Sequence, residues 1–118
     1  MTEGEPPGVW NMDHGRLRTL WSIIDYHAHR TPGRVAMEYD GRLTTYAEMA
    51  ARAEAMDAAL RASGAGPQAR IGYLGKNCDL YFTLLAAVSR AGMVLVPLNW
   101  RLAPDEWQFI IEDAEVSL

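Results

Sequence analysis

The sequence predicts an α/β fold: the start of a doubly wound parallel sheet, preceded by a helix and a β-hairpin. Three observations support this class. Apolar residues recur at helical spacing from Thr19 onward, and Asp40-Gly41 separates two short segments that read as strands. From Ala69 onward, a short apolar segment, a helical segment and a second short apolar segment follow one another. That order is typical of a βαβ unit, whose two strands are parallel.

The first two predicted elements are a helix and a hairpin. Apolar residues three or four positions apart predict the helix, and Thr31-Pro32-Gly33 ends it. These apolar residues are Leu20, Trp21, Ile24 and Ala28. Segments 34–39 and 42–45 flank Asp40-Gly41, and both turn residues tolerate the positive φ of a tight type I′ turn. We therefore expect an antiparallel hairpin directly after the first helix.

A second helix is predicted to begin after Thr45, which can form a capping box with Glu48. The pairs Glu48/Arg52 and Asp57/Arg61 stand at i,i+4 spacing and are expected on the outside of this helix. Ser-Gly-Ala-Gly-Pro at 63–67 ends it. Its apolar face consists of Tyr46, Met49, Ala50, Ala53, Met56 and Leu60.

The βαβ unit is predicted as strand 69–74, helix 79–91 and strand 93–97. Asn77 or Cys78 caps the helix at its beginning, and Gly92 closes it. Apolar residues occupy nearly every direction around this helix, so we expect it to be covered on more than one side. They are Leu80, Tyr81, Phe82, Leu84, Leu85, Ala86, Ala87 and Val88.

A fourth helix is expected to begin at Pro104, which suits the first helical turn. Asp105 and Glu106 are expected to face the positive end of the helix dipole, in preference to a role in acid–base catalysis. Residues 116–118 are predicted to form the next parallel strand. The inner face of the helix is expected to consist of Trp107, Ile110, Ile111 and Ala114.

Composition and charge exclude several functional classes. The formal net charge is −4, with 15 acidic and 11 basic residues, so nucleic-acid binding is not expected. Arg90 and Pro97 interrupt the apolar run 80–98, so we expect no membrane span. Residues 1–18 are expected to be a disordered lead-in, because the N-terminus is acidic and rich in Pro and Gly, unlike a signal peptide. The single cysteine, Cys78, fits a reducing, cytoplasmic setting.

Most residues that carry reactive groups favour structural roles. Segment 72–76 places Gly and Lys after a strand but lacks the spacing of a phosphate loop, so a plain strand-to-helix turn is expected. His14, His27 and His29 do not form a common metal-binding face. Cys78 stands near a helix N-terminus, where its thiol pKa is lowered or where it serves only in capping and packing. No catalytic, cofactor-binding or metal-binding residue is therefore assigned.

Asn99-Trp100-Arg101 is the remaining surface candidate. It follows the C-terminal end of a predicted parallel strand, where open α/β sheets present their ligand-binding loops. Two interpretations stay open. Trp100 packs over a sheet edge while Arg101 binds a carbonyl or a carboxylate, or the three residues form a binding surface or an interface.

Four segments of the chain, taken in order, carry a family resemblance. They are RLTTYAEM at 42–49, GAGPQARI at 64–71, KNCDL at 76–80 and AGMVLVPLNWRL at 91–102. Together they closely resemble the N-terminal region of the AMP-forming acyl-CoA synthetases, members of the adenylate-forming superfamily. The resemblance covers residues 19–118.

This resemblance implies a two-step ligase. A carboxylic acid attacks the α-phosphate of MgATP to give an acyl-adenylate and pyrophosphate, and the thiol of coenzyme A then displaces AMP. The sequence Asn99-Trp100-Arg101-Leu102 is similar to that of members acting on fatty or medium-chain acids. ATP, Mg and CoA are thus implied for the full-length enzyme. The family's phosphate loop, adenine and magnesium motif, ribose-binding Asp and catalytic Lys have no counterpart in these 118 residues.

Two hypotheses follow. In the first, residues 19–118 are the N-terminal part of the large domain of an acyl-CoA synthetase, truncated at its C-terminal end. This part is expected to bind no cofactor alone and to be inactive without the remainder of the enzyme. In the second, the chain is a stand-alone, non-catalytic interaction or oligomerisation module that uses an exposed sheet edge and its apolar helix to pair with itself or with a partner. A homo-oligomer is expected in either case.

Overall fold

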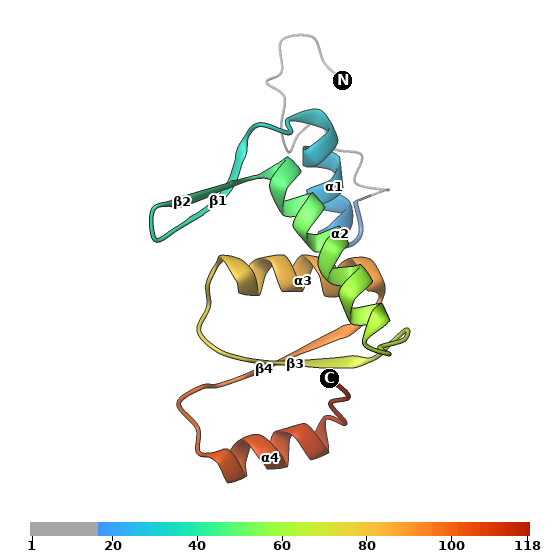
Figure 1. The fold of residues 1–118 in the computed structure, drawn as a ribbon, viewed down its shortest axis with the longest axis vertical. Coiled ribbons are helices and arrows are strands. Elements are labelled where there is room, and N and C mark those ends of the chain that lie inside the picture. The colour runs from blue at the N-terminus through green and yellow to red at the C-terminus, as the bar shows by residue number, and fades with distance from the viewer. Residues whose placement is uncertain (1–16) are drawn as a thin grey trace.

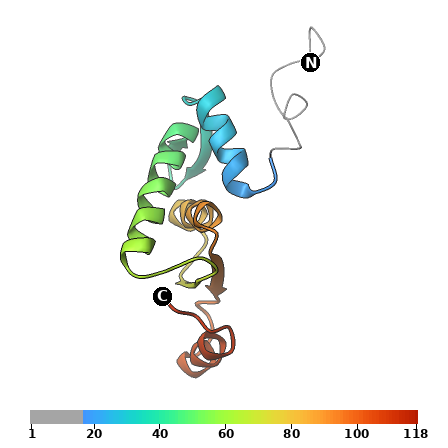
Figure 2. The same cartoon turned by 90° about the vertical axis from the view of Figure 1, so that its right-hand side faces the viewer.

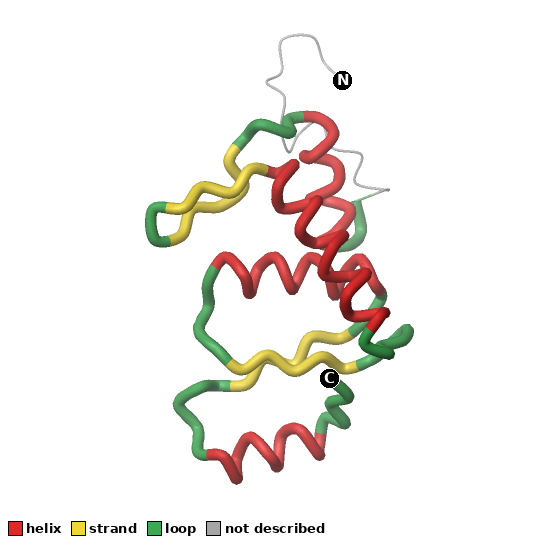
Figure 3. The backbone as a smooth tube through the Cα atoms, in the orientation of Figure 1, coloured by secondary structure: helices red, strands yellow, loops and turns green. Residues whose placement is uncertain are grey.

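The computed structural model describes residues 17–118 as a stack of layers (Figure 1). Two helices and a hairpin lie at one end, a third helix and a small parallel sheet follow, and a fourth helix lies at the other end (Figure 3). The expected disordered lead-in, residues 1–18, lies outside the described residues except for its last two positions.

Helix α1, Leu20–Arg30, and helix α2, Tyr46–Ala62, both begin with capping boxes. At α1, the amide of Ser22 donates to the Thr19 hydroxyl at 3.1 Å, and the Ser22 hydroxyl accepts from the Thr19 amide at 3.0 Å. At α2, Thr45 and Glu48 exchange the same two bonds at 3.1 and 3.0 Å. The predicted capping box of α2 is therefore confirmed, because local sequence alone is sufficient to form it.

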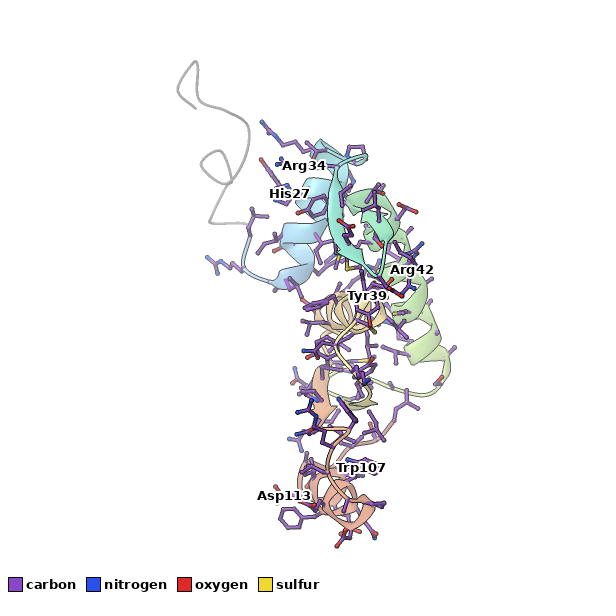
Figure 4. The ribbon with its side chains drawn as sticks, turned by 90° about the vertical axis from the view of Figure 1, so that its left-hand side faces the viewer. His27, Arg34, Tyr39, Arg42, Trp107 and Asp113 are labelled. Carbon is purple, nitrogen blue, oxygen red and sulfur yellow. The ribbon has the colours of Figure 1, made fainter. Side chains whose placement is uncertain are left out.

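The hairpin consists of β1, Val35–Tyr39, and β2, Arg42–Thr45, paired antiparallel. Its turn residues Asp40 and Gly41 have φ of 51° and 78°, as a type I′ turn requires. Arg42 ties the tip of the hairpin to the third helix, because its guanidinium donates two hydrogen bonds to the Asp79 carboxylate, at 3.0 and 3.2 Å. The same guanidinium lies over the ring of Tyr39, and Figure 4 shows these two labelled side chains together.

The predicted βαβ unit is present: β3 spans Arg70–Leu74, α3 spans Asp79–Ala91 and β4 spans Val94–Leu98. The two strands are parallel, with Arg70 opposite Val94 and Leu74 opposite Leu98. Gly92 ends α3 with φ of 69°, the left-handed conformation that favours glycine. The boundaries differ from the predicted ones by a single residue at the strands.

Helix α4, Pro104–Asp113, leads the chain back to the free side of β3. The amide of Ser117 donates to the carbonyl of Arg70 at 2.9 Å, and the amide of Gly72 donates to that of Leu118 at 2.8 Å. Residues 116–118 do not form the predicted regular strand, because these bonds do not continue into a ladder. The two bonds still place β3 between β4 and residues 117–118.

Helices α3 and α4 lie on opposite faces of the sheet in both views (Figures 1 and 2). This is the arrangement of a doubly wound sheet, and the predicted fold class is confirmed. Gly72 permits this arrangement at the centre of the sheet, because a Cβ atom at position 72 would stand 3.0 Å from Cγ1 of Val116.

Helix α3 is covered on two sides, as its apolar sequence predicts. Ala86 and Ala87 belong to a core cluster with α1 and α2, whereas Val88 and Ala91 belong to a second cluster with the sheet. Two large apolar side chains of the same helix, Leu80 and Phe82, are exposed.

Asp57 corrects a prediction. It was expected on the outside of α2, but its side chain is 1% exposed. The guanidinium of Arg61 donates to it at 2.5 Å, and that of Arg90 on α3 also donates to it. Burial alone would raise the pKa of Asp57, but the hydrogen bonds and charges of the two arginines outweigh burial and lower it.

A second link joins α1 to the end of α3. The amide of Trp21 donates to the hydroxyl of Ser89 at 3.0 Å, across 68 positions of sequence. The guanidinium of Arg90 lies 5.3 Å from the centroid of the Trp21 ring, within the range of a cation–π contact. Arg90 therefore contacts both α1 and the buried carboxylate of α2.

The outer edge of β4 carries a proline. The amide of Val94 donates to Ala69, on the side of β3, and amides alternate in direction along a strand. The nitrogen of Pro97 therefore faces the free edge, where it offers no donor. A proline at this position hinders the addition of another strand.

Helix α4 differs from the predicted packing, since none of its residues is buried. Trp107, Ile110 and Ala114 of the expected inner face are half-buried, and Ile111 is exposed. Phe109 is 68% exposed. The apolar spacing marks a face correctly, but within the described residues little packs against it.

Candidate functional site

The loops that follow β3 and β4 meet at one edge of the sheet. Because the strands are parallel and in register from Arg70 opposite Val94 onward, their carboxyl ends lie side by side. A cleft of about 400 Å³ lies between the two loops. Its lining consists of Tyr73, Gly75, Lys76, Asn77, Tyr81, Pro97, Leu98, Asn99, Trp100 and Arg101.

Trp100 brings two cations together in this cleft. The ammonium nitrogen of Lys76 lies 4.8 Å from the centroid of the indole ring, and the guanidinium carbon of Arg101 lies 5.1 Å from it. Both distances are within the range of cation–π attraction. The indole ring thus contacts one cation from each of the two loops.

Asn99 builds the turn that presents Trp100. Its side-chain oxygen accepts from the amide of Arg101 at 3.0 Å. Its carbonyl accepts from the indole N–H of Trp107 at 2.7 Å and from the amide of Leu102 at 3.1 Å. Of the three predicted surface residues, Trp100 and Arg101 present their side chains to the cleft, and Asn99 also fixes their backbone.

Tyr73 closes the turn on the other side of the cleft. Its hydroxyl donates to the carbonyl of Lys76 at 2.9 Å and lies 3.5 Å from the sulfur of Cys78. The hydrogen bond with Cys78, together with burial, raises the pKa of Tyr73 to about 12. The ring folds back over Gly75, where a Cβ atom would stand 2.9 Å from the tyrosine hydroxyl.

Cys78, one of the two residues predicted to cap α3, occupies its N-cap position. Its side chain makes no capping hydrogen bond. The thiol is half-buried and contacts Tyr73 instead. This hydrogen bond and those from the backbone of Tyr81 and Leu80 lower the pKa of Cys78. The structure thus combines the two interpretations of this residue, because a lowered thiol pKa accompanies a packing position.

The described histidines have structural contacts. His27, labelled in Figure 4, packs between the rings of Tyr26 and Tyr46 at 5.2 and 4.9 Å, and His29 bonds to the backbone of Asp25. His14 lies outside the described residues. Within residues 17–118, no group of three His, Cys, Asp or Glu side chains is placed to hold a metal ion.

The remaining expectations concern carboxylates and membranes. Glu106 accepts from the amide of Ala103 at 3.2 Å, so it supports the beginning of α4, as predicted. Across the described part of the chain, no helix combines the length and the apolar character needed to cross a bilayer.

Lys76 and Tyr73 are two lining residues of the cleft that sequence reasoning missed. Lys76 was interpreted only as part of a plain turn, and Tyr73 as a strand residue. The available signal was their position, because both lie at the carboxyl end of a parallel strand, next to the loop that was singled out.

Comparison with known proteins identifies the family. The model of the AMP-binding enzyme family matches residues 24–118. A fatty acid–[acyl-carrier-protein] ligase of Streptomyces coeruleorubidus is 35% identical over 91% of this chain and 21% of its own length. An indoleacetate–CoA ligase of Aromatoleum aromaticum is 37% identical over 80% of this chain and 19% of its own length. The chain thus spans about a fifth of the length of these relatives.

Solved structures agree with this result. A candidate long-chain-fatty-acid CoA ligase of Rhodopseudomonas palustris superimposes with a TM-score of 0.79 at 33% identity, over 84% of this chain and 25% of that one. The N-terminal subdomain of Klebsiella oxytoca NpsA, at 24% identity and a TM-score of 0.77, shares the fold over 85% of this chain and 26% of its own. The chain therefore belongs to the AMP-binding enzyme family, and it corresponds to the N-terminal part of those enzymes.

Proposed function

We propose that this chain is the N-terminal part of an ATP-dependent carboxylic acid–CoA ligase. In the first half-reaction, a carboxylate oxygen of the acid attacks the α-phosphorus of ATP and pyrophosphate leaves. In the second, the thiol sulfur of CoA attacks the acyl carbon and AMP leaves. The observation that carries the proposal is the family match over residues 24–118, together with relatives named as acid ligases.

We further propose that the acid is a fatty or medium-chain acid. The Asn99-Trp100-Arg101-Leu102 sequence and the fatty acid ligase of S. coeruleorubidus support this class. Relatives named as indoleacetate–CoA ligase and feruloyl-CoA synthase favour aromatic acids as the alternative. A panel of both classes of acid therefore belongs in any activity assay.

The cleft beside Trp100 is proposed to bind a phosphate-bearing substrate of this reaction, ATP or CoA. Lys76 and Arg101 supply two cations, and both side chains are exposed. A guanidinium and an ammonium are the groups that recognise phosphate most strongly in proteins. Asn77 and the hydroxyl groups of the lining add neutral polar groups around them.

The 118 residues alone are proposed to be inactive, because the family's nucleotide and catalytic motifs have no match in them. The test joins residues 1–118 to the remaining four-fifths of the Aromatoleum ligase, in place of its own N-terminal part. We expect the chimera to release AMP only when ATP, Mg²⁺, CoA and an acid are all present, and the chain alone to release none. A chimera that melts cooperatively but forms no acyl-adenylate would contradict the proposed ligase function. AMP release by the 118-residue chain alone would contradict the proposed inactivity of that chain.

The alternative function is a stand-alone interaction module. The exposed side chains of Leu80, Phe82 and Phe109 favour an interface, whereas Pro97 opposes pairing through the edge of β4. This hypothesis expects a dimer or larger species by light scattering. A monomer at the highest soluble concentration would exclude self-association.

A further inference from the structure

The turn between β3 and α3 contains a hydrogen bond, from the Tyr73 hydroxyl to the Lys76 carbonyl, that the proposed binding of phosphate does not itself explain. Lys76 is a long, flexible side chain on a surface turn, and such a side chain loses rotamer entropy when its charge is held at one place. Its ammonium is nevertheless placed at 4.8 Å from the Trp100 ring centroid. Something must fix the direction in which the side chain leaves the turn.

Tyr73 meets this requirement. It lies on β3, in register opposite Pro97, so the sheet fixes its backbone. Its hydroxyl donates to the carbonyl of Lys76 at 2.9 Å and also contacts the sulfur of Cys78 at 3.5 Å. The bond spans the turn from β3 to Lys76 and holds the peptide unit attached to the Lys76 Cα atom, from which the side chain leaves.

Gly75 allows the tyrosine to reach that carbonyl. An ideal Cβ atom at position 75 would stand 2.9, 3.0 and 3.3 Å from atoms of the Tyr73 ring and hydroxyl, closer than Cβ atoms pack in practice. The ring is also braced from the helix side, because Tyr81 lies 5.1 Å away between centroids. Strand, turn and helix therefore all fix the tyrosine hydroxyl.

We propose that Tyr73 is a positioning residue, which acts through the Lys76 backbone to hold the Lys76 ammonium over Trp100 and so sets the affinity of the cleft for phosphate-bearing ligands. The affinity part of this statement rests on the proposed function of the cleft, whereas the positioning part does not. A tyrosine hydroxyl has an ordinary pKa of about 10, so it is protonated and available as a donor throughout the neutral range.

The positioning part is tested without any ligand, by NMR of the 118-residue chain. A lysine ε-methylene held over an indole ring has upfield-shifted protons, and we expect that shift in the wild type. Tyr73→Phe keeps the ring but removes the donor, and Gly75→Ala displaces the ring; both are expected to return the Lys76 shift towards the free value. Tyr46→Phe, at the opposite end of the stack, is the matched control and should leave it unchanged. An unchanged shift in Tyr73→Phe would overturn the proposal.

The affinity part is tested in the chimera with the Aromatoleum ligase, because the 118 residues alone are expected to bind no cofactor. A double-mutant cycle is combined there with calorimetric titration of CoA and, separately, of ATP. Tyr73→Phe is expected to weaken binding about fivefold, the loss typical of one hydrogen bond. In a Lys76→Met background the same change is expected to have an effect below about twofold. Equal losses in both backgrounds would mean that Tyr73 acts on the fold in general and would overturn its action through Lys76. Unchanged binding of both ligands in Lys76→Met, with the NMR result intact, would reject the proposed function of the cleft but not the positioning.

Discussion

The junction of α1, α2 and α3 and the helix α4 show two ways in which the same chain forms helices. At the junction, Ile24, Met49 and Ala53 are buried and Asp57 is enclosed by arginines. In α4 no residue is buried, although Pro104 and Glu106 mark its beginning with one of the two capping bonds that Thr45 and Glu48 form at α2. Helix formation in this molecule thus follows local sequence, whereas burial depends on partners far along the chain.

The difference has an energetic meaning. Burial of a large aliphatic side chain contributes about 1.5–3 kcal/mol, and a domain of this size is stable by roughly 5–15 kcal/mol. A few side chains at the junction therefore decide whether the chain folds. Side chains of α4 are expected to contribute little to that equilibrium. Five measurements test the contrast, and each uses the free energy of unfolding unless stated otherwise.

Ile24→Ala is expected to have the largest effect. The residue is 4% exposed, and its replacement leaves a cavity among α1, α2 and α3. We expect a loss of about 3 kcal/mol, within the range for aliphatic residues replaced by alanine in cores. Urea unfolding followed by circular dichroism measures it. A loss below about 1 kcal/mol would show that the junction is not the stabilising region.

Asp57→Ala is expected to cost about 2 kcal/mol, because it removes the acceptor of two charge-assisted hydrogen bonds. The loss is moderated because the side chains of Arg61 and Arg90 are 55% and 37% exposed and can turn to water. Glu54→Ala, an exposed acid on the same helix, is the control and should be near neutral. A similar small loss in both variants would contradict the importance of the buried carboxylate.

The same carboxylate predicts how stability depends on pH. The pKa of Asp57 is lower in the folded chain than in the unfolded chain, so its contribution is present above the unfolded pKa and is lost as pH falls through the folded pKa. We expect wild-type stability to decline below about pH 4. Asp79, whose pKa is lowered by its hydrogen bond to Arg42, adds to the decline. The free energy of unfolding should fall less steeply with decreasing pH in Asp57→Ala than in the wild type. An identical slope in both proteins would rule out the contribution of Asp57.

Thr45→Ala is expected to cost about 1 kcal/mol, the usual loss for an N-cap hydroxyl. The hydroxyl accepts from the Glu48 amide at 3.1 Å, and this partner is lost. Thermal unfolding of Thr45→Ser, which keeps an acceptor, provides the control. Equal destabilisation by both substitutions would indicate that the methyl group and not the cap is responsible.

Phe109→Ala is expected to have the smallest effect, below about 0.5 kcal/mol, because the side chain is 68% exposed. It is matched to Ile24→Ala as a large apolar side chain on a helix of the same chain. A loss approaching that of Ile24→Ala would remove the contrast between the two regions.

Much of the fold could be predicted because its signals are local. Asp40-Gly41 specifies its turn, Thr45 and Glu48 specify the start of α2, and Gly92 specifies the end of α3. Each of these rests on contacts within a few residues. The parallel pairing of β3 and β4 followed from the order of the elements.

The remainder depended on distant contacts. Spacing pairs Asp57 with Arg61, but its second partner, Arg90, is 33 positions away, so the sequence pattern could not show that the carboxylate is buried. The apolar face of α4 was recognisable, yet its degree of burial was not. At the cleft, Trp100 and Arg101 could be identified from their place after β4. Lys76 could be assigned to the cleft only from the three-dimensional structure, which places the turn after β3 beside Trp100.

The bond from the Trp21 amide to Ser89 has a consequence for the order in which the chain acquires its structure. The partners are separated by 68 positions, so α1 cannot gain this contact before α3 exists. The hairpin and α2, which use neighbouring residues, can form earlier. During synthesis, α1 can therefore pack against α2 as soon as α2 has formed, whereas its bond to Ser89 has to follow the translation of α3.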